Sequence, residues 1–126
     1  MSLAAQALAL PMWRWAGGSL ALMPFGTGQI HRRVDADSQM SPEELPDLTD
    51  PATMGGLEAI ALERGVSWYC GSDYSWAKVV DWRGHRMHMV RSHPRDGPPP
   101  TVIERRLLLA ECLIVALSKT LKGANE

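Results

Sequence analysis

The chain has 126 residues, 45% of them apolar, with 13 lysine or arginine and 14 aspartate or glutamate side chains, which gives a formal net charge of −1. This length suits one domain, residues 1–126, and the mean hydropathy of −0.15 is typical of a soluble globular protein. The net charge is far from that of a strongly basic nucleic-acid-binding domain. An apolar run covers residues 3–13, but no lysine or arginine precedes it and it is too short to span a bilayer, so we expect neither a signal peptide nor an anchor.

The charges are segregated along the chain. Residues 1–33 hold three basic and no acidic side chains, residues 34–63 hold eight acidic and no basic ones, and residues 64–126 hold ten basic and six acidic ones. This asymmetry is compatible with an ordinary mixed-sign surface and equally with a face that meets a charged partner. Two distant cysteines, Cys70 and Cys112, do not make a disulfide framework, so we expect reduced thiols in a cytoplasmic protein.

Short strands are predicted for the first third of the chain. Residues 13–15 and 19–23 are predicted to pair around the turn at Gly17-Gly18, and residues 30–34 to add a third strand. Residues 35–46 are polar and acidic and contain prolines, so we expect an exposed connection with one helical turn at residues 42–45.

The best-delimited helix begins at Pro51, with Asp50 as its N-cap and Gly65 at its end. Its interior carries two glycines, each of which costs about 1 kcal/mol relative to alanine. They belong to a stripe almost free of side chains, which predicts that a strand or another helix lies close against it. The stripe consists of Ala52, Gly55, Gly56 and Ala59.

Three strands and a long helix are predicted for the C-terminal half. The strands cover residues 66–70, 74–82 and 85–91, and the middle one alternates in character. One of its faces carries Tyr74, Trp76, Lys78, Val80 and Trp82, and the other carries Ser75, Ala77, Val79 and Asp81. An extended linker, residues 92–100, leads to a capping box of Thr101 and Glu104 for a helix that ends near Lys122. Together these elements predict an α+β fold, with two main helices packed on one face of an antiparallel meander sheet.

The last helix is apolar over more of its circumference than the roughly 100° stripe of a one-sided helix. Its core stripe is predicted to be Ile103, Leu107, Ala110, Ile114, Leu117 and Leu121. The excess favours a homodimer seam formed by Leu108, Cys112 and Val115. In the alternative, the N-terminal strands or the apolar residues 3–10 fold back over this face and leave a monomer.

The helix that begins at Pro51 is led by a distinctive run, Leu45-Pro46-Asp47-Leu48-Thr49-Asp50-Pro51-Ala52-Thr53. This run resembles a segment, close to LPDLxDPATLG, that recurs in short uncharacterised proteins of tailed phages and prophages. Trp13-Arg14-Trp15 is similar to the opening of some of them. The resemblance ends by Gly65 and implies an origin in a bacterial mobile genetic element, without an activity.

The densest functional chemistry lies in residues 82–95, which read WRGHRMHMVRSHPR. Arginines on a hairpin can contact phosphates and a tryptophan can stack on bases, and the same residue types anchor acidic protein surfaces. An arginine-rich solvated strand is the plain alternative. The candidate partner-binding residues are Trp82, Arg83, Arg86, Arg91 and Arg95.

The acidic segment offers the opposite kind of surface. Its carboxylates belong either to a solvated connection whose last member caps a helix, or to a mimic of nucleic-acid phosphates that occupies a basic groove of a host protein. The second strategy is known among phage inhibitors of bacterial defence, so the resemblance favours it. The candidates are Asp35, Asp37, Glu43 and Glu44, followed by Asp47 and Asp50.

No pattern predicts a catalytic or metal centre. Cys70, His85, His88 and His93 are of types that bind zinc, but on a strand His85 and His88 point to opposite faces. Cys70 with a histidine lacks an identifiable orienting group or oxyanion turn. We therefore expect no enzyme activity, no cofactor and no metal.

These observations favour a non-enzymatic accessory protein of a phage or prophage that binds a host protein in the bacterial cytoplasm, as an inhibitor of an anti-phage defence system such as CRISPR. The alternative is a small nucleic-acid-binding regulator that uses the arginine- and histidine-rich hairpin, residues 82–95.

Overall fold

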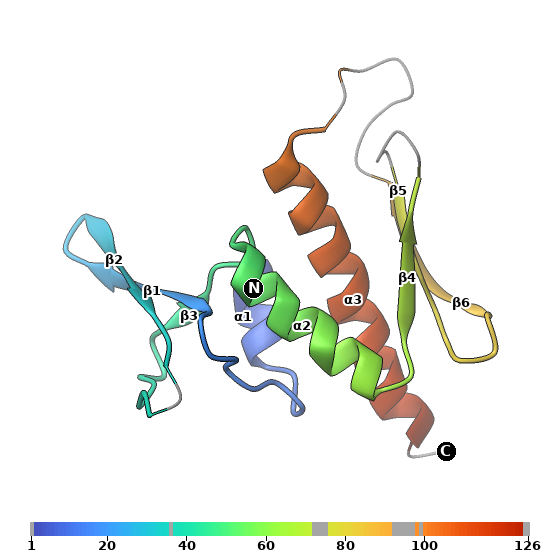
Figure 1. The fold of residues 1–126 in the computed structure, drawn as a ribbon, viewed down its shortest axis with the longest axis horizontal. Helices are drawn as coiled ribbons and strands as arrows, with labels where there is room; N and C mark the ends of the chain where they lie inside the picture. Colours follow the sequence, from blue (N-terminus) through green and yellow to red (C-terminus); the bar gives the residue numbers. More distant parts are fainter. Residues whose placement is uncertain (1, 36, 72–75, 92–97, 99, 125–126) are drawn as a thin grey trace.

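The computed structural model describes residues 2–35, 37–71, 76–91, 98 and 100–124, with side chains up to residue 120. Within these residues the chain forms three helices and six strands. The helices are α1 (Leu3–Leu8), α2 (Pro51–Glu63) and α3 (Val102–Ala124), and the strands are β1 (Leu20–Phe25), β2 (Gly28–Arg33), β3 (Leu45–Pro46), β4 (Ser67–Cys70), β5 (Trp76–Val80) and β6 (Arg86–Arg91). Figure 1 shows a three-stranded antiparallel sheet at each end of the molecule, with the helices between them. The predicted α+β class is confirmed, and the strands are divided between two sheets.

The first sheet has the strand order β2-β1-β3 and is built on the hairpin of β1 and β2. The hairpin turns at Gly26, whose φ of +59° is a conformation that suits glycine. Leu20 lies opposite Arg33 at the open end of the hairpin, and Leu22 lies opposite Leu45 where β3 joins the other edge of β1. The strands predicted at residues 19–23 and 30–34 are therefore confirmed as parts of β1 and β2.

The strand predicted at residues 13–15 is wrong. The rings of Trp13 and Trp15 meet edge to face, with 5.6 Å between their centroids, and their backbone has no strand partner among the described residues. The partner of β1 comes instead from the chain that follows it. Aromatic side chains suggested a strand here, but Trp13 packs against the buried core instead.

The connection between the β1–β2 hairpin and α2 is less exposed than predicted. The backbone N–H of Glu44 donates to the carbonyl of Ser41 at 3.1 Å, so a turn forms, but Leu45-Pro46 continues as β3 and not as a helical turn. Glu44 and Pro46 are both buried.

Helix α2 has the predicted boundaries. The carboxylate of Asp50 accepts the backbone N–H groups of Ala52 and Thr53, each at 3.1 Å, and Gly65 follows the helix with a φ of +74°. A Cβ added to Gly56 would lie 2.9 Å from Cβ of Ala16, so a loop, and not a strand or helix, packs against the small-residue stripe.

Gly55, unlike Gly56, has no close neighbour outside the helix. A Cβ added to it would meet nothing within 4 Å, because the position faces away from the loop. The prediction of a close neighbour therefore holds at Gly56 and fails at Gly55.

The second sheet is the predicted meander, with the order β4-β5-β6 and antiparallel pairing throughout. The predicted alternation holds at residues 76–79, where Ala77 and Val79 are fully buried under α3 while Trp76 and Lys78 face away from it. It ends at Val80, which is also buried and follows an irregularity in the pairing with β6. The predicted start of this strand, Tyr74 and Ser75, lies outside the described residues. β6 starts one residue later than expected.

Helix α3 is the centre of the core, which explains its broad apolar surface. One side packs on β5 and β6, and other sides pack on α2 and α1 (Figure 1). A helix covered from several directions needs more than one apolar stripe. The buried residues of α3 are Leu108, Ala110, Cys112, Leu113, Ile114, Ala116 and Leu117.

Two expectations about α3 require correction. The first turns project beyond the core, so Ile103 is 53% and Leu107 is 37% exposed, although both were assigned to the core stripe. Leu108 and Cys112 are buried within a single chain and are not available for the predicted homodimer seam. One part of the alternative is observed, because residues 3–8 form α1, which folds back onto α3, while Cys112 packs on β5 and β6. Self-association stays a prediction, but the apolar surface of α3 no longer supports it.

Candidate binding face on the second sheet

The outward side of the second sheet gathers cations and aromatic rings from all three strands. Residues opposite each other in an antiparallel pair share a face, and the register places Lys78 between Tyr69 of β4 and Met89 of β6. Trp76 lies opposite Arg91 in the same way. A groove of about 680 Å³ runs over this surface. We call the surface the outer sheet face, formed by Tyr69, Trp76, Lys78, Val80, Arg86, Met89 and Arg91.

Within the described part of the chain, the cations of the outer sheet face have no acidic partners. Among the residues that the structure describes, Lys78, Arg86 and Arg91 make no ion pair with a carboxylate. The guanidinium of Arg86 is instead 4.0 Å from the sulfur of Met89. Three positive charges on one small surface repel each other and attract an anion.

The aromatic rings of the face are held in defined positions. The ammonium of Lys78 lies 5.5 Å from the ring centroid of Tyr69 and 5.8 Å from that of Trp76, which is cation–π distance. The indole of Trp76 lies directly against the backbone of Gly71, because a Cβ at Gly71 would be 2.5 Å from Nε1 of the indole. Gly71 also donates its backbone N–H to the carbonyl of Trp76 at 3.0 Å.

A tight turn beside the face presents a second aromatic and cationic pair. The carboxylate of Asp81 accepts the backbone N–H groups of Arg83 and His85, each at 2.9 Å, and this closes the turn between β5 and β6. Trp82 is 76% exposed, and the guanidinium of Arg83 lies 4.7 Å from its ring centroid. The turn therefore projects an arginine stacked on a tryptophan.

The structure brings together most of the basic candidates from the sequence. Arg86 and Arg91 lie on the outer sheet face, and Trp82 and Arg83 lie on the adjoining turn. Arg95 lies outside the described residues. Tyr69, Trp76 and Lys78 were not among the candidates, although the predicted alternation of the middle strand placed Trp76 and Lys78 on one face. Only the strand register adds Tyr69 to them.

The first of the acidic candidates, Glu44, is buried and hydrogen-bonded inside the molecule. The carboxylate of Glu44 is 5% exposed and accepts two hydrogen bonds from the guanidinium of Arg32, both at 2.8 Å, and one from the backbone N–H of Ser41 at 3.0 Å. The hydrogen bonds from Arg32, then that from Ser41, hold the pKa of Glu44 below its ordinary value. Glu44 is thus a structural residue and does not present a carboxylate to a partner, which corrects its assignment.

Asp50 is also neutralised inside the molecule. It is 7% exposed and pairs with Arg33 at 2.7 Å while it caps α2. Burial alone would raise the pKa of Asp50, but the hydrogen bonds from Arg33 and Thr53 outweigh burial and lower it.

Three acidic candidates remain at the surface, namely Asp35, Asp37 and Glu43. The carboxylate of Asp35 accepts the backbone N–H of Asp37 at 3.0 Å, so it is partly engaged in a local turn. What is left of the acidic segment is a short exposed loop rather than an extended acidic surface.

The cysteines and histidines do not assemble into a reactive centre among the described residues. No three metal-binding side chains lie together there, and His93 lies outside those residues. Cys112 contacts the carbonyls of Ala77 and His88 at 3.5 Å, and burial raises the pKa of its thiol to about 11. Cys70 is exposed, and desolvation of its sulfur, followed by the charge of Glu58, raises its pKa.

His88 behaves as a packed strand residue. Burial, followed by the positive charge of Lys119, lowers the pKa of its imidazole.

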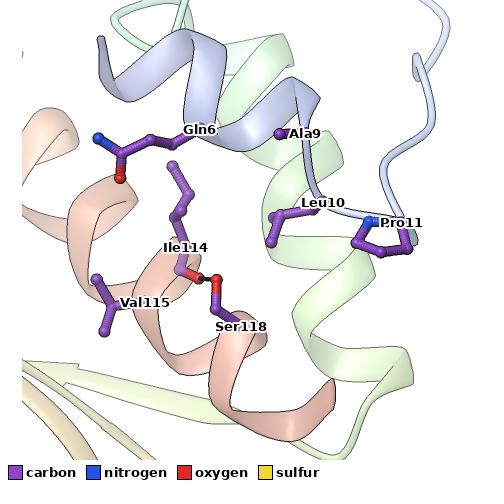
Figure 2. A pocket seen from close by; sticks show the side chains of 7 residues that line it. All are labelled: Gln6, Ala9, Leu10, Pro11, Ile114, Val115 and Ser118. Atoms are coloured by element: carbon purple, nitrogen blue, oxygen red, sulfur yellow. Dashed lines mark hydrogen bonds between the residues drawn. The ribbon is translucent and has the colours of Figure 1, made fainter. Parts of the chain in front are cut away.

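A second groove, of about 510 Å³, lies where the end of α1 meets α3. Figure 2 shows Leu10 and Pro11 on one side of it and Ile114 and Ser118 on the other. The Ser118 hydroxyl donates to the carbonyl of Ile114 at 2.9 Å, so its proton is engaged in a hydrogen bond within the helix. Half-buried Val115, which was assigned to the dimer seam, also lines this groove. Its walls are mainly apolar and carry no charge.

Comparisons with known proteins give no assignment, because no protein-family model, no curated protein and no solved structure matches this chain. None of the described helices combines the length and hydrophobicity that a bilayer crossing requires.

Proposed function

We propose that the chain is a non-enzymatic nucleic-acid-binding protein and that it binds through the outer sheet face. The observation that carries this proposal is a set of three cations, Lys78, Arg86 and Arg91, placed around Tyr69 and Trp76. None of the three pairs with a carboxylate of the residues that the structure describes. Phosphates satisfy such cations, and the release of counterions from the nucleic acid drives the association.

The net charge of −1 is compatible with this proposal, because the acidic and the basic side chains gather in different parts of the molecule. The acidic residues of the segment 34–63 lie around the first sheet and α2, whereas the outer sheet face carries three cations and no acid. A phosphate chain responds to the local field within about 10 Å at ordinary salt. The distant carboxylates then help to orient the molecule.

The proposal is tested with a fluorescein-labelled oligonucleotide of about 16 nucleotides. We expect micromolar affinity at low salt by fluorescence anisotropy, and a plot of log K against log salt with a slope of about −2, since three cations each contribute about −0.7. Arg86→Gln should weaken binding and make the slope shallower by about 0.7.

The matched control is Gln29→Glu. Gln29 is exposed on β2 of the first sheet, and this substitution changes the net charge by the same amount as Arg86→Gln. Equal weakening by both variants would show a general charge effect and contradict a site on the outer sheet face. Absence of binding at low salt would contradict the function.

A second candidate is an accessory protein of a phage or prophage that binds a host protein, as an inhibitor of a defence system. The exposed stack of Arg83 on Trp82 favours it, since these residue types are common anchors of protein interfaces. The resemblance of the segment around Asp50 to phage proteins supports the same origin. Affinity capture from a bacterial host should then recover one protein with the wild-type chain and lose it with Trp82→Ala.

A further inference from the structure

We infer that the outer sheet face takes single-stranded nucleic acid, with unpaired bases stacked on Tyr69 and Trp76. This inference rests on the proposed function and adds the substrate class. It follows from the arrangement of the two rings around Lys78 and from the support of Trp76 by Gly71.

The two rings and the cation between them match the chemistry of a dinucleotide. The distances from Lys78 place the two ring centroids no more than about 11 Å apart. Neighbouring bases of an extended single strand can cover this span. A base on each ring would leave the phosphate that joins them near the Lys78 ammonium, and Arg91, opposite Trp76, would meet the next phosphate.

Trp76 is arranged in advance for stacking. The missing side chain of Gly71 provides the space that the indole occupies, and the backbone bond from Gly71 to Trp76 fixes the local geometry. A ring that is already immobilised loses little side-chain entropy on binding. Gly71 therefore serves by the space that it leaves for the indole of Trp76.

A duplex cannot use these rings. Its bases are stacked inside the helix, so a sheet surface reaches only the phosphates and the base edges. A single strand offers phosphates and unstacked base faces together, and each stacked base improves affinity by about tenfold or more. The cations predict binding to both forms, and the rings predict preference for the single strand.

The test compares three probes of equal length: oligothymidylate, a duplex, and a strand of abasic sites that keeps the phosphates but lacks bases. We expect oligothymidylate to bind at least about tenfold more tightly than the other two. Trp76→Leu should reduce oligothymidylate affinity by about tenfold and leave the affinity for the abasic strand unchanged. Trp76→Phe, which keeps a ring, should restore most of the loss.

Two further variants separate stacking from folding. Tyr69 is 55% exposed, so Tyr69→Leu should fold and lose about tenfold in oligothymidylate affinity. Gly71→Ala leaves every charge and ring in the chain but displaces the indole, and should act in the same direction as Trp76→Leu. Phe25→Leu, which changes an exposed ring on β1 of the first sheet, is the control and should change affinity by less than about twofold.

The outcomes distinguish the inference from the function on which it rests. Equal affinity for all three probes would overturn the inference and keep the proposed function. Binding to none of them, with capture of a host protein, would overturn both. Loss of abasic-strand binding in Tyr69→Leu would show that the ring supports the fold of the face rather than a base, and would also overturn the inference.

Discussion

The two sheets of this chain place the same kinds of charged residue in opposite situations. In the first sheet, Arg32 and Arg33 of β2 reach across to the buried carboxylates of Glu44 and Asp50. In the second sheet, the arginines of β6 make no ion pair with a carboxylate among the described residues. An arginine on a strand is thus a structural residue where the chain supplies a carboxylate opposite it, and is available to a partner where it does not.

The difference follows from how each sheet is supported. α3 packs on β5 and β6, and Ala77 and Val79 are fully buried beneath it, so the second sheet is held by its apolar side. The first sheet has such support only near β3, where α1 packs on it and Ala21 is buried, whereas Phe25 and Ile30 at its hairpin end are 69% and 41% exposed. Hydrogen-bonded ion pairs hold this sheet to the segment before α2. The first sheet therefore depends on its charges and the second does not.

The largest expected effect comes from opening the core around α3, the helix on which β5 and β6 pack. Leu113→Ala truncates a fully buried side chain of α3 and should lower the free energy of unfolding by about 3 kcal/mol, through lost burial and a cavity. Urea unfolding followed by circular dichroism measures it. Leu107→Ala on the same helix is the control, because Leu107 is 37% exposed, and should cost less than about 1 kcal/mol. Equal losses would mean that α3 is not the centre of the core.

The next effect tests the charges of the first sheet. Glu44→Ala removes the acceptor of two Arg32 hydrogen bonds and of the Ser41 N–H, and should cost about 2 kcal/mol. Glu44→Gln keeps the shape and one acceptor oxygen, so it should lose less. Chemical denaturation at pH 7 provides both numbers. A change below about 0.5 kcal/mol for Glu44→Ala would place this carboxylate among ordinary surface groups.

The pH dependence of the free energy of unfolding tests the contribution of the buried carboxylates of the first sheet. The folded-state pKa values of Glu44 and Asp50 lie below their ordinary values of 4.5 and 3.8, so the folded chain holds fewer protons there than the unfolded one. Their stabilisation is present above those values and is lost as pH falls through the folded pKa values. The free energy of unfolding should therefore decline below pH 4.5, and Glu44→Gln should flatten part of that decline. A profile identical to the wild type would contradict the role of Glu44.

The smallest effect on stability is expected at the outer sheet face. Arg86→Gln and Arg91→Gln should each change the free energy of unfolding by less than about 0.5 kcal/mol, because neither side chain pairs with a carboxylate in the described part of the chain. Thermal melting beside the oligonucleotide assay measures this. A destabilisation similar to that of Glu44→Ala would mean that these cations are structural, and the contrast between the sheets would disappear.

Local signals in the sequence determined much of the secondary structure. Asp50, Pro51 and Gly65 delimit α2 because caps involve residues only a few positions apart. Alternation within β5 placed Trp76 and Lys78 on one face, since the two-residue period of a strand is a property of the backbone. The α+β class and the meander followed from these signals.

Tertiary structure decided which surfaces are free. The broad apolar surface of α3 suggested a dimer seam, and only the packing of the second sheet, α1 and α2 around this helix shows that Leu108 and Cys112 are core residues. Composition placed Glu44 in an exposed acidic block, but strand pairing brings Arg32 across to it and buries it. Tyr69 joins Trp76 and Lys78 only through the register of β4 with β5. Local patterns specify caps and faces because nearby residues create them, whereas burial and charge pairing depend on segments that folding brings together from distant parts of the chain.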